Sequence, residues 1–223
     1  MNDNLTYHFI IEQGTLEWFD LKIGKISGTS CQTLLTDPKG KKDTKELGTG
    51  AKQMVLKKAA EIITGSPSVQ FSGNGVTDWG NEMEPLSIQE YELNELCVVE
   101  TVGFVQDGNF KGFSPDGIVG DTGLVESKCL QPTEHLKKFL SKKIDKAHMA
   151  QMQWGLFVSG RVWYDNIYYN PKFPEGTDYF KIRVERDEEM IEKFKIRSDQ
   201  AIKEICAILS NTKFNGAFKT LTL

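Results

Sequence analysis

The sequence predicts an α/β fold in which a mixed central β-sheet is flanked by helices. The residues from Gly112 to Cys129 have the pattern of a β-hairpin, and segments with helical periodicity precede and follow it. Further strand patterns lie on either side of the hairpin. A chain of 223 residues is long enough for a sizeable core, so we expect one domain over residues 1–223.

The other elements follow from periodicity, capping residues and turns. Before the hairpin, the patterns predict a short lead strand, a helix over 17–24, a helix opened by the hydroxyl residues 27–30, a polar loop over 37–50, helices over about 51–63 and 77–93, and a strand over 98–105. After it, they predict a helix over 132–141, an amphipathic helix over 147–159, strands over 161–169 and 179–185, and a closing helix over 187–209.

The hairpin carries the side chains of greatest chemical interest. Because side chains alternate along a strand, Glu126 and Lys128 point to one face and Ser127 to the other. The turn over 120–123 has the composition of a tight reversal, which would bring Asp116 beside Glu126. The sequence therefore predicts two carboxylates and one ammonium group close together.

An acidic and a basic residue two apart on a strand most often form a solvated face. Here the neighbours are apolar: Ile118, Val119, Leu124, Val125 and Cys129. Buried charges need a partner or a metal ion. Carboxylate oxygens suit Mg²⁺ or Mn²⁺, which can act on a phosphodiester, and the lysine can orient or deprotonate the attacking water.

Composition excludes several classes of protein. Hydrophobic residues make up 39% and charged residues 26%, and no apolar run approaches the roughly 20 residues of a membrane span, so we expect a soluble protein without a membrane partner. We see no secretory signal and expect a cytosolic location. Four dispersed cysteines and three histidines argue against a zinc site or a disulfide framework. The net charge of −4 excludes coating of nucleic acid by bulk charge, although a local basic groove remains compatible with it.

Five sequence blocks in order resemble the lambda exonuclease or YqaJ-type viral recombinases, within the PD-(D/E)xK nuclease superfamily. The blocks are Glu-Trp-x-x-x-Lys-x-Gly-x-Ile-Ser from Glu17, Gly80-x-x-x-Glu84, Ser114-Pro115-Asp116-Gly117, Glu126-x-Lys128-Cys129, and His148-Met-Ala-Gln-Met-Gln153. The resemblance covers about Leu16 to Glu185. It implies a single nuclease domain with the restriction-endonuclease-like core.

The resemblance also implies an activity and partners. The protein would be a Mg²⁺-dependent 5′→3′ exonuclease on double-stranded DNA, using Mg²⁺ or Mn²⁺ with two ions per site. It would leave 3′ single strands for phage-type recombination with a single-strand annealing protein. Members of the family form ring-shaped homotrimers around DNA, and a phage or prophage origin would place the protein in the host cytosol.

Catalytic roles are carried over position by position. Asp116 and Glu126 would bind the metal ions together with the backbone carbonyl of Ser127, and Lys128 would serve the water. Glu84 matches the acidic residue on a helix that binds metal, with Glu82 as the competing candidate and a solvated helix face as the alternative. Gln151 matches a catalytic glutamine near the nucleophile; an ordinary surface amide is its alternative.

The remaining matches concern DNA. Lys22, Thr29 and Ser114 correspond to a pocket for the 5′ phosphate, where the lambda enzyme has arginine in place of Lys22. Trp18 matches a tryptophan at the entrance, or it packs the first helix. Four lysines after the hairpin would contact DNA, or form a solvated face: Lys137, Lys138, Lys142 and Lys143. The rival functions are a restriction or junction-resolving endonuclease and a recombination module that binds DNA without catalysis.

Overall fold

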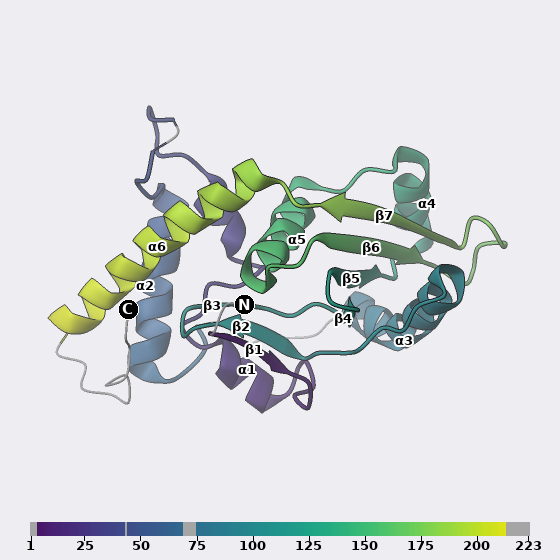
Figure 1. Cartoon of the computed structure of the whole chain (residues 1–223), viewed down its shortest axis with the longest axis horizontal. Helices are drawn as coiled ribbons and strands as arrows, with labels where there is room; N and C mark the ends of the chain where they lie inside the picture. Colours follow the sequence, from purple (N-terminus) through teal and green to yellow (C-terminus); the bar gives the residue numbers. More distant parts are fainter. Residues whose placement is uncertain (1–3, 43, 69–74, 213–223) are drawn as a thin grey trace.

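Two β-sheets and the helices around them make up residues 4–42, 44–68 and 75–212, the part of the chain that this computed structural model describes (Figure 1). The first sheet is antiparallel, with strand order β1 (Leu5–His8), β2 (Phe104–Asp107) and β3 (Lys111–Phe113). The second has the order β4 (Gly117–Val119), β5 (Gly123–Lys128), β6 (Trp163–Tyr169) and β7 (Tyr179–Glu185). It is mixed, because β5 and β6 are parallel while the other pairs are antiparallel. The predicted α/β class is confirmed, but the strands divide between two sheets.

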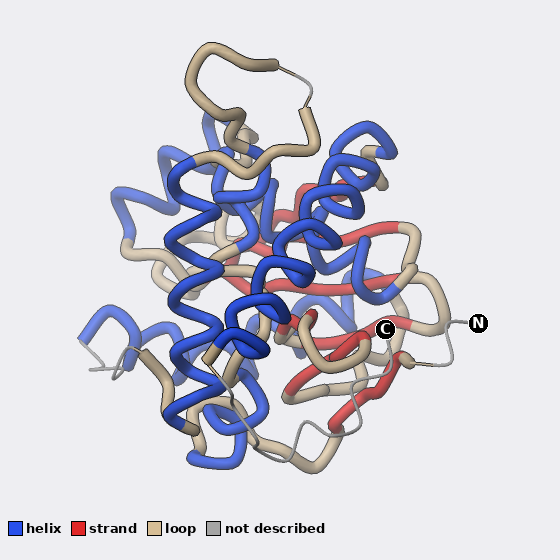
Figure 2. Tube along the Cα trace, turned by 90° about the vertical axis from the view of Figure 1, so that its left-hand side faces the viewer, coloured by secondary structure: helices blue, strands red, loops and turns tan. Residues whose placement is uncertain are grey.

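The helices surround these sheets. They are α1 (Leu16–Lys22), the 3₁₀ helix η1 (Cys31–Leu35), α2 (Thr49–Thr64), α3 (Gly75–Glu95), α4 (Pro132–Ser141), α5 (Lys146–Ser159) and α6 (Glu188–Asn211). Helices α2 and α6 pack against each other at one end of the molecule, and Figure 2 shows them in front of the strands. Helix α5 contacts strands of both sheets and so joins them. None of the helices in the described residues has the length and apolar character needed to cross a membrane.

The main core lies around α5. Trp154 is fully buried, packs edge-on against Phe194 of α6, and donates its indole N–H to the carbonyl of Gly112 at 3.1 Å. The residues from Met152 to Leu156 are all buried. The predicted helix is confirmed, but its predicted amphipathic character is wrong, because beyond its exposed first turn the helix is enclosed by both sheets and α6.

A second cluster fixes α3 on the mixed sheet. Tyr91 of α3 donates its hydroxyl to Asp165 Oδ2 at 2.8 Å, and Asp165 of β6 is fully buried. Arg183 of β7 donates to both oxygens of Asp165 at 2.7 Å, and Lys181 joins Asp165 to Glu95 at the end of α3. The buried carboxylate is thus fully paired, as a charge in this position must be. These contacts hold α3, which carries Glu84, against β6 and β7.

Two other local predictions need correction. The alternation over 98–105 does not give a continuous strand, because before β2 begins at Phe104 the segment forms only an isolated bridge from Glu100 to Ile118 and one backbone hydrogen bond from Gly103 to His8. Val98 is 78% exposed. The segment 27–30, with its three hydroxyl residues, precedes only the five-residue η1, and Ser30 makes no side-chain cap there. Instead Ser30 Oγ accepts the N–H of Ser27, which closes a tight turn.

Candidate active site

The β4–β5 hairpin brings Asp116 beside Glu126, as the sequence predicts. Gly117 pairs with Val125, so the residues just beyond this pair face each other. The N–H of Asp116 donates to the carbonyl of Val125 at 3.1 Å, and Asp116 Oδ2 accepts the N–H of Ser127 at 2.6 Å. The backbone of the second arm therefore fixes the carboxylate of the first.

Glu126 is buried and has a donor at each carboxylate oxygen. Lys128 Nζ lies 2.6 Å from Oε1, and Gln151 Nε2 of α5 lies 3.4 Å from the same atom. The hydroxyl of Tyr164 donates to Oε2 at 3.1 Å. Lys128 and Gln151 lie where the sequence and the family resemblance predict them, whereas no sequence signal pointed to Tyr164.

Glu84 lies within electrostatic reach of this pair. Its side chain is half-buried, and burial followed by the charge of Glu126 raises the pKa of its carboxyl. The competing candidate, Glu82, is exposed. The structure therefore favours Glu84 as the third acidic group near Asp116 and Glu126.

The three carboxyl groups repel one another. Burial, then Glu126 and Glu84, raise the pKa of Asp116 well above its ordinary value, against the opposing effects of Lys128 and the Ser127 N–H. Burial alone would lower the pKa of Lys128, but Glu126 and Asp116 raise it, so this side chain stays an ammonium ion at neutral pH. One cation beside three acidic groups leaves the site short of positive charge.

The donor set fits a divalent metal ion. Within the described residues, no three His, Cys, Asp or Glu side chains are already arranged to enclose a metal ion. The chemistry nevertheless agrees with Mg²⁺ or Mn²⁺, since hard carboxylate oxygens are their preferred ligands and a cation would offset both the burial and the repulsion that raise the pKa of Asp116. Ser127 contributes its N–H to Asp116; metal binding by its carbonyl stays a prediction.

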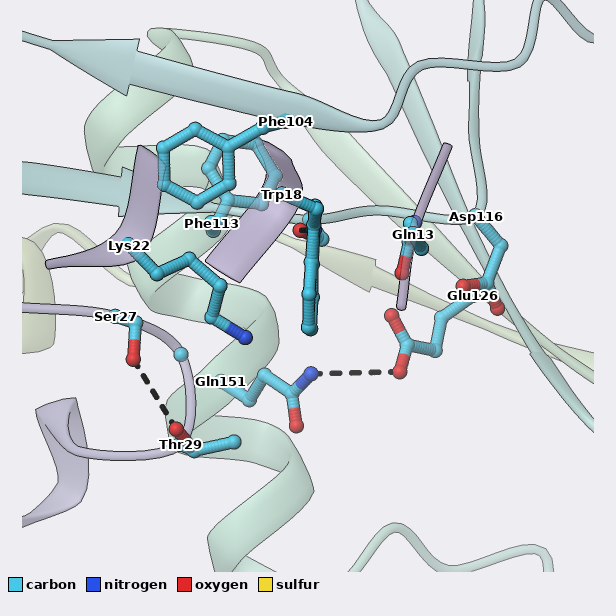
Figure 3. A pocket seen from close by; sticks show the side chains of 12 residues that line it. Gln13, Trp18, Lys22, Ser27, Thr29, Phe104, Phe113, Asp116, Glu126 and Gln151 are labelled. Carbon is cyan, nitrogen blue, oxygen red and sulfur yellow. Dashed lines mark hydrogen bonds between the residues drawn. The ribbon is translucent and has the colours of Figure 1, made fainter. Parts of the chain in front are cut away.

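A cavity of about 170 Å³ joins this acidic site to the predicted phosphate pocket. Its walls come from α1, the segment after it, β2, β3, the hairpin and α5 (Figure 3). The lining residues are Gln13, Trp18, Lys22, Ser27, Gly28, Thr29, Phe104, Phe113, Ser114, Asp116, Glu126 and Gln151. All three predicted phosphate ligands and three predicted catalytic residues therefore line one space.

Trp18 connects two of the phosphate-pocket residues. Its indole N–H donates to Ser114 Oγ at 2.8 Å, and to the carbonyl of Gly103 at 3.1 Å. The ammonium group of Lys22 lies 3.4 Å from the centre of a Trp18 ring. Burial, then Lys58, lower the pKa of Lys22 to about 8. Trp18 thus holds the hydroxyl and the cation in place, at an energy typical of cation–π contacts, about 0.5–2 kcal/mol.

The predicted DNA-contacting lysines lie outside this cavity, and three of them have partners within the chain. Lys137 pairs with Glu134 at 2.6 Å, Lys138 pairs with Asp145 at 2.7 Å, and Lys142 lies over the rings of Phe139 and Phe180 at 3.9 and 3.6 Å. Lys143 is exposed. A role for these lysines in DNA binding stays a prediction.

Comparison with known proteins decides the family. The YqaJ-like viral recombinase domain matches residues 17–162, well over half of the chain. The chain belongs to this family. The matched region contains every residue of the predicted site and the whole of α5.

Solved structures agree with this assignment. An alkaline exonuclease, LHK-Exo from Laribacter hongkongensis, is 27% identical with a TM-score of 0.75, covering 89% of this chain and 96% of that one. The same enzyme in complex with dAMP gives 26% identity and a TM-score of 0.74 over the same shares. A phage-related exonuclease from Haemophilus somnus 129PT shares the fold, at 20% identity and a TM-score of 0.68 over 84% of this chain and 96% of that one. A search of curated protein sequences gave no match. The predicted family and the predicted class of enzyme, a DNA nuclease, are confirmed.

Proposed function

We propose that the protein is a Mg²⁺-dependent 5′→3′ exonuclease on double-stranded DNA that leaves 3′ single strands for recombination. The observation that carries the proposal is the single cavity shared by the acidic site and by Lys22, Thr29 and Ser114. A terminal phosphate held by these three residues would place the adjoining phosphodiester toward Asp116 and Glu126. The end of the strand, rather than its interior, would then define the cleaved bond.

Asp116, Glu126, Glu84 and the carbonyl of Ser127 would hold the metal, with two ions at each site. When bound, Mg²⁺ supplies charge stabilisation and an activated water. The protein's own groups complete the site. Tyr164 and Lys128 each fix one oxygen of Glu126.

Lys128 orients the attacking water in this proposal. The two acidic neighbours raise its pKa, which favours an orienting ammonium ion over a general base. Gln151 hydrogen-bonds to Glu126 from the opposite wall and is placed to align the nucleophile (Figure 3).

The phosphate pocket supports the 5′ polarity. A lysine and two hydroxyl groups that line one cavity form a candidate anion site. Hydrolysis next to a retained terminal phosphate releases a 5′-mononucleotide. The related LHK-Exo has been crystallised with dAMP, a compound of this kind.

Further elements of the proposal concern assembly. With a net charge of −4 the chain has little general attraction for DNA, and a homotrimeric ring around the duplex would keep it on its track. The 3′ strand would pass to a single-strand annealing protein. We place this activity in the cytosol of a phage or prophage host.

An endonuclease is the second candidate, because the same carboxylates and lysine serve both reactions. One gel separates the two. Linear duplex labelled at the 5′ or the 3′ end and a closed circle are digested in parallel with Mg²⁺. We expect early loss of the 5′ label, gradual shortening of 3′-labelled strands and an intact circle; linearised circle would contradict the exonuclease, and an absence of any digestion would favour a binding module.

A further inference from the structure

Three lysines lie within electrostatic reach of one another beside the phosphate pocket, because the charge of Lys58 acts on both Lys22 and Lys25. Lys58 of α2, which is buried, pairs with Glu61 Oε2 at 2.8 Å. The same oxygen accepts the N–H of Gly24 at 3.1 Å. Gly24 lies between Lys22 and Lys25 in the sequence, so this ion pair anchors the turn that carries both side chains. In the described part of the chain, Glu61 is the only carboxylate that forms an ion pair with any of the three lysines.

Lys25 is a half-buried cation next to another cation. Burial, followed by the charge of Lys58, lowers the pKa of Lys25 to about 8, as it does for Lys22. A partly desolvated ammonium group without a carboxylate partner is unfavourable. A bound anion would remove that penalty for both lysines.

Lys25 is on the same side of its segment as the pocket. Ile26 forms a bridge with Lys111 and is fully buried, so the segment is extended at this point. Residues on either side of an extended residue share the opposite face. Ser27, which shares that face with Lys25, lines the cavity. Lys25 itself does not line it, but its flexible four-carbon side chain can turn toward an anion held there.

We propose that Lys25 is a second phosphate-binding cation of this pocket, which makes the pocket selective for a doubly charged terminal phosphate. This proposal rests on the proposed 5′-end function of the same site. A phosphate monoester carries about −1.5 to −2 charge at neutral pH, whereas a phosphodiester carries one negative charge. Lys22 balances one charge and Lys25 balances the second. An internal phosphate would leave one lysine without its partner.

The test is the binding of dAMP, with deoxyadenosine as the uncharged comparison. Calorimetry measures the affinity of the wild type, Lys25→Met, Lys25→Arg and Lys57→Met for each compound. Lys57 is the matched control, because it is exposed on the same helix as Lys58. We expect Lys25→Met to weaken dAMP binding about tenfold, as for loss of a charge-assisted contact, with deoxyadenosine binding unchanged. Lys25→Arg and Lys57→Met should bind dAMP as the wild type does.

The number of protons that the protein takes up when it binds dAMP, measured at a pH slightly above 8, gives a second readout. A bound dianion raises the pKa of Lys22 and Lys25, so the wild type should take up protons, and Lys25→Met should take up fewer. The other charged groups near these lysines are Lys58 with its partner Glu61 on α2, and Asp116 and Glu126, which line the cavity. They are present in both proteins, so the difference reports the loss of Lys25 and of its charge beside Lys22.

Equal dAMP affinity in wild type and Lys25→Met would overturn the proposal. So would an equal loss of dAMP and deoxyadenosine binding, which would indicate general damage to the pocket. If the wild type digests DNA from the 5′ end while Lys25→Met still binds dAMP normally, the proposed function holds but Lys25 has no part in it. Failure of the wild type to digest DNA would instead contradict the function itself.

Discussion

Tyr164 donates its hydroxyl to Glu126 Oε2 at 3.1 Å, from the strand that runs parallel to the one carrying Glu126. Burial, then Glu126 and Asp116, raise the pKa of Tyr164 well above its ordinary value, so it stays a donor at neutral and mildly alkaline pH. Lys128 occupies the other oxygen of Glu126. The proposed metal ligand is therefore held in a fixed orientation before any ion binds.

Tyr164→Phe removes this hydrogen bond and keeps the ring in the core. We expect Glu126 to be less well oriented, and the Mg²⁺ concentration for half-maximal digestion to rise about five- to tenfold, in keeping with about 1–1.5 kcal/mol for one hydrogen bond. The measurement is the initial rate against Mg²⁺ concentration. A lower melting temperature with an unchanged Mg²⁺ dependence would assign Tyr164 a purely structural role.

The raised pKa of Asp116 predicts how stability without metal depends on pH. A folded state that binds this proton more tightly than the unfolded state gains stability below the ordinary pKa of 3.8, and loses it as the pH rises through the higher folded value. Asp116→Asn removes the titration and keeps an acceptor for the Ser127 N–H. At neutral pH in chelator we expect this variant to melt above the wild type, by about 2–4 °C for each kcal/mol of repulsion relieved.

The gain from Asp116→Asn should shrink as the pH falls toward 4. Thermal melts across this range, followed by circular dichroism, provide the check. Greater stabilisation in acid than at neutral pH would show that the raised pKa of Asp116 is not the cause.

The same titration links metal binding to pH. Because Asp116 holds its proton above its ordinary range, a metal ion must displace a proton, and metal affinity should increase with pH until that carboxyl is fully ionised. We expect Mn²⁺ binding, measured by calorimetry, to release protons in the wild type. Asp116→Asn should bind the ion more weakly and release fewer protons; an equal release by both proteins would point to another group.

The hairpin site could be predicted from sequence because its information is local. Alternation, a tight turn and apolar neighbours are sufficient to place Asp116, Glu126 and Lys128 together. The position of Tyr164 could not be predicted in this way. Its contact depends on the parallel pairing of β5 with β6, in which Leu124 lies opposite Tyr164, and the connection between these strands includes two helices.

The strand predicted over 98–105 is too long for a physical reason. The residues from Val98 to Val102 have strand propensity, but strand formation requires a partner, and Glu100 alone finds one. The sequence of α5 predicts a helix, but how much of that helix is buried depends on the elements packed around it. The phosphate pocket depended on the family resemblance, because Lys22, Thr29 and Ser114 come from separate segments that only the fold brings together.

The phosphate pocket predicts a preference for phosphorylated ends. Lys22→Ala should slow digestion of 5′-phosphorylated duplex and leave digestion of 5′-hydroxyl duplex little changed. The wild type's preference for the phosphorylated end, worth about 1.5–3 kcal/mol for a charge-assisted contact, would then disappear. Initial rates on the two substrates, for wild type and variant, give the ratio. Equal rates on both ends by the unmodified enzyme would show that the pocket has another ligand.

The proposed ring predicts an oligomer with a characteristic salt response. Light scattering should give three times the chain mass of 25.2 kDa. Loading should weaken with salt, because it depends on screened charge, whereas processivity against a DNA trap should persist once the duplex is enclosed. A monomer that digests distributively would exclude the ring.

The central claim is that the acidic residues and the phosphate pocket form one exonuclease site directed at the 5′ end. The most direct measurement is mass spectrometry of the first products released, with Mg²⁺, from a duplex whose 5′ and 3′ terminal nucleotides all differ. We predict that 5′-mononucleotides appear in order from the 5′ ends. Asp116→Ala, Glu126→Ala and Lys128→Ala should each slow their release about a hundredfold or more. First products from the 3′ ends, or release of internal oligonucleotides, would contradict the account.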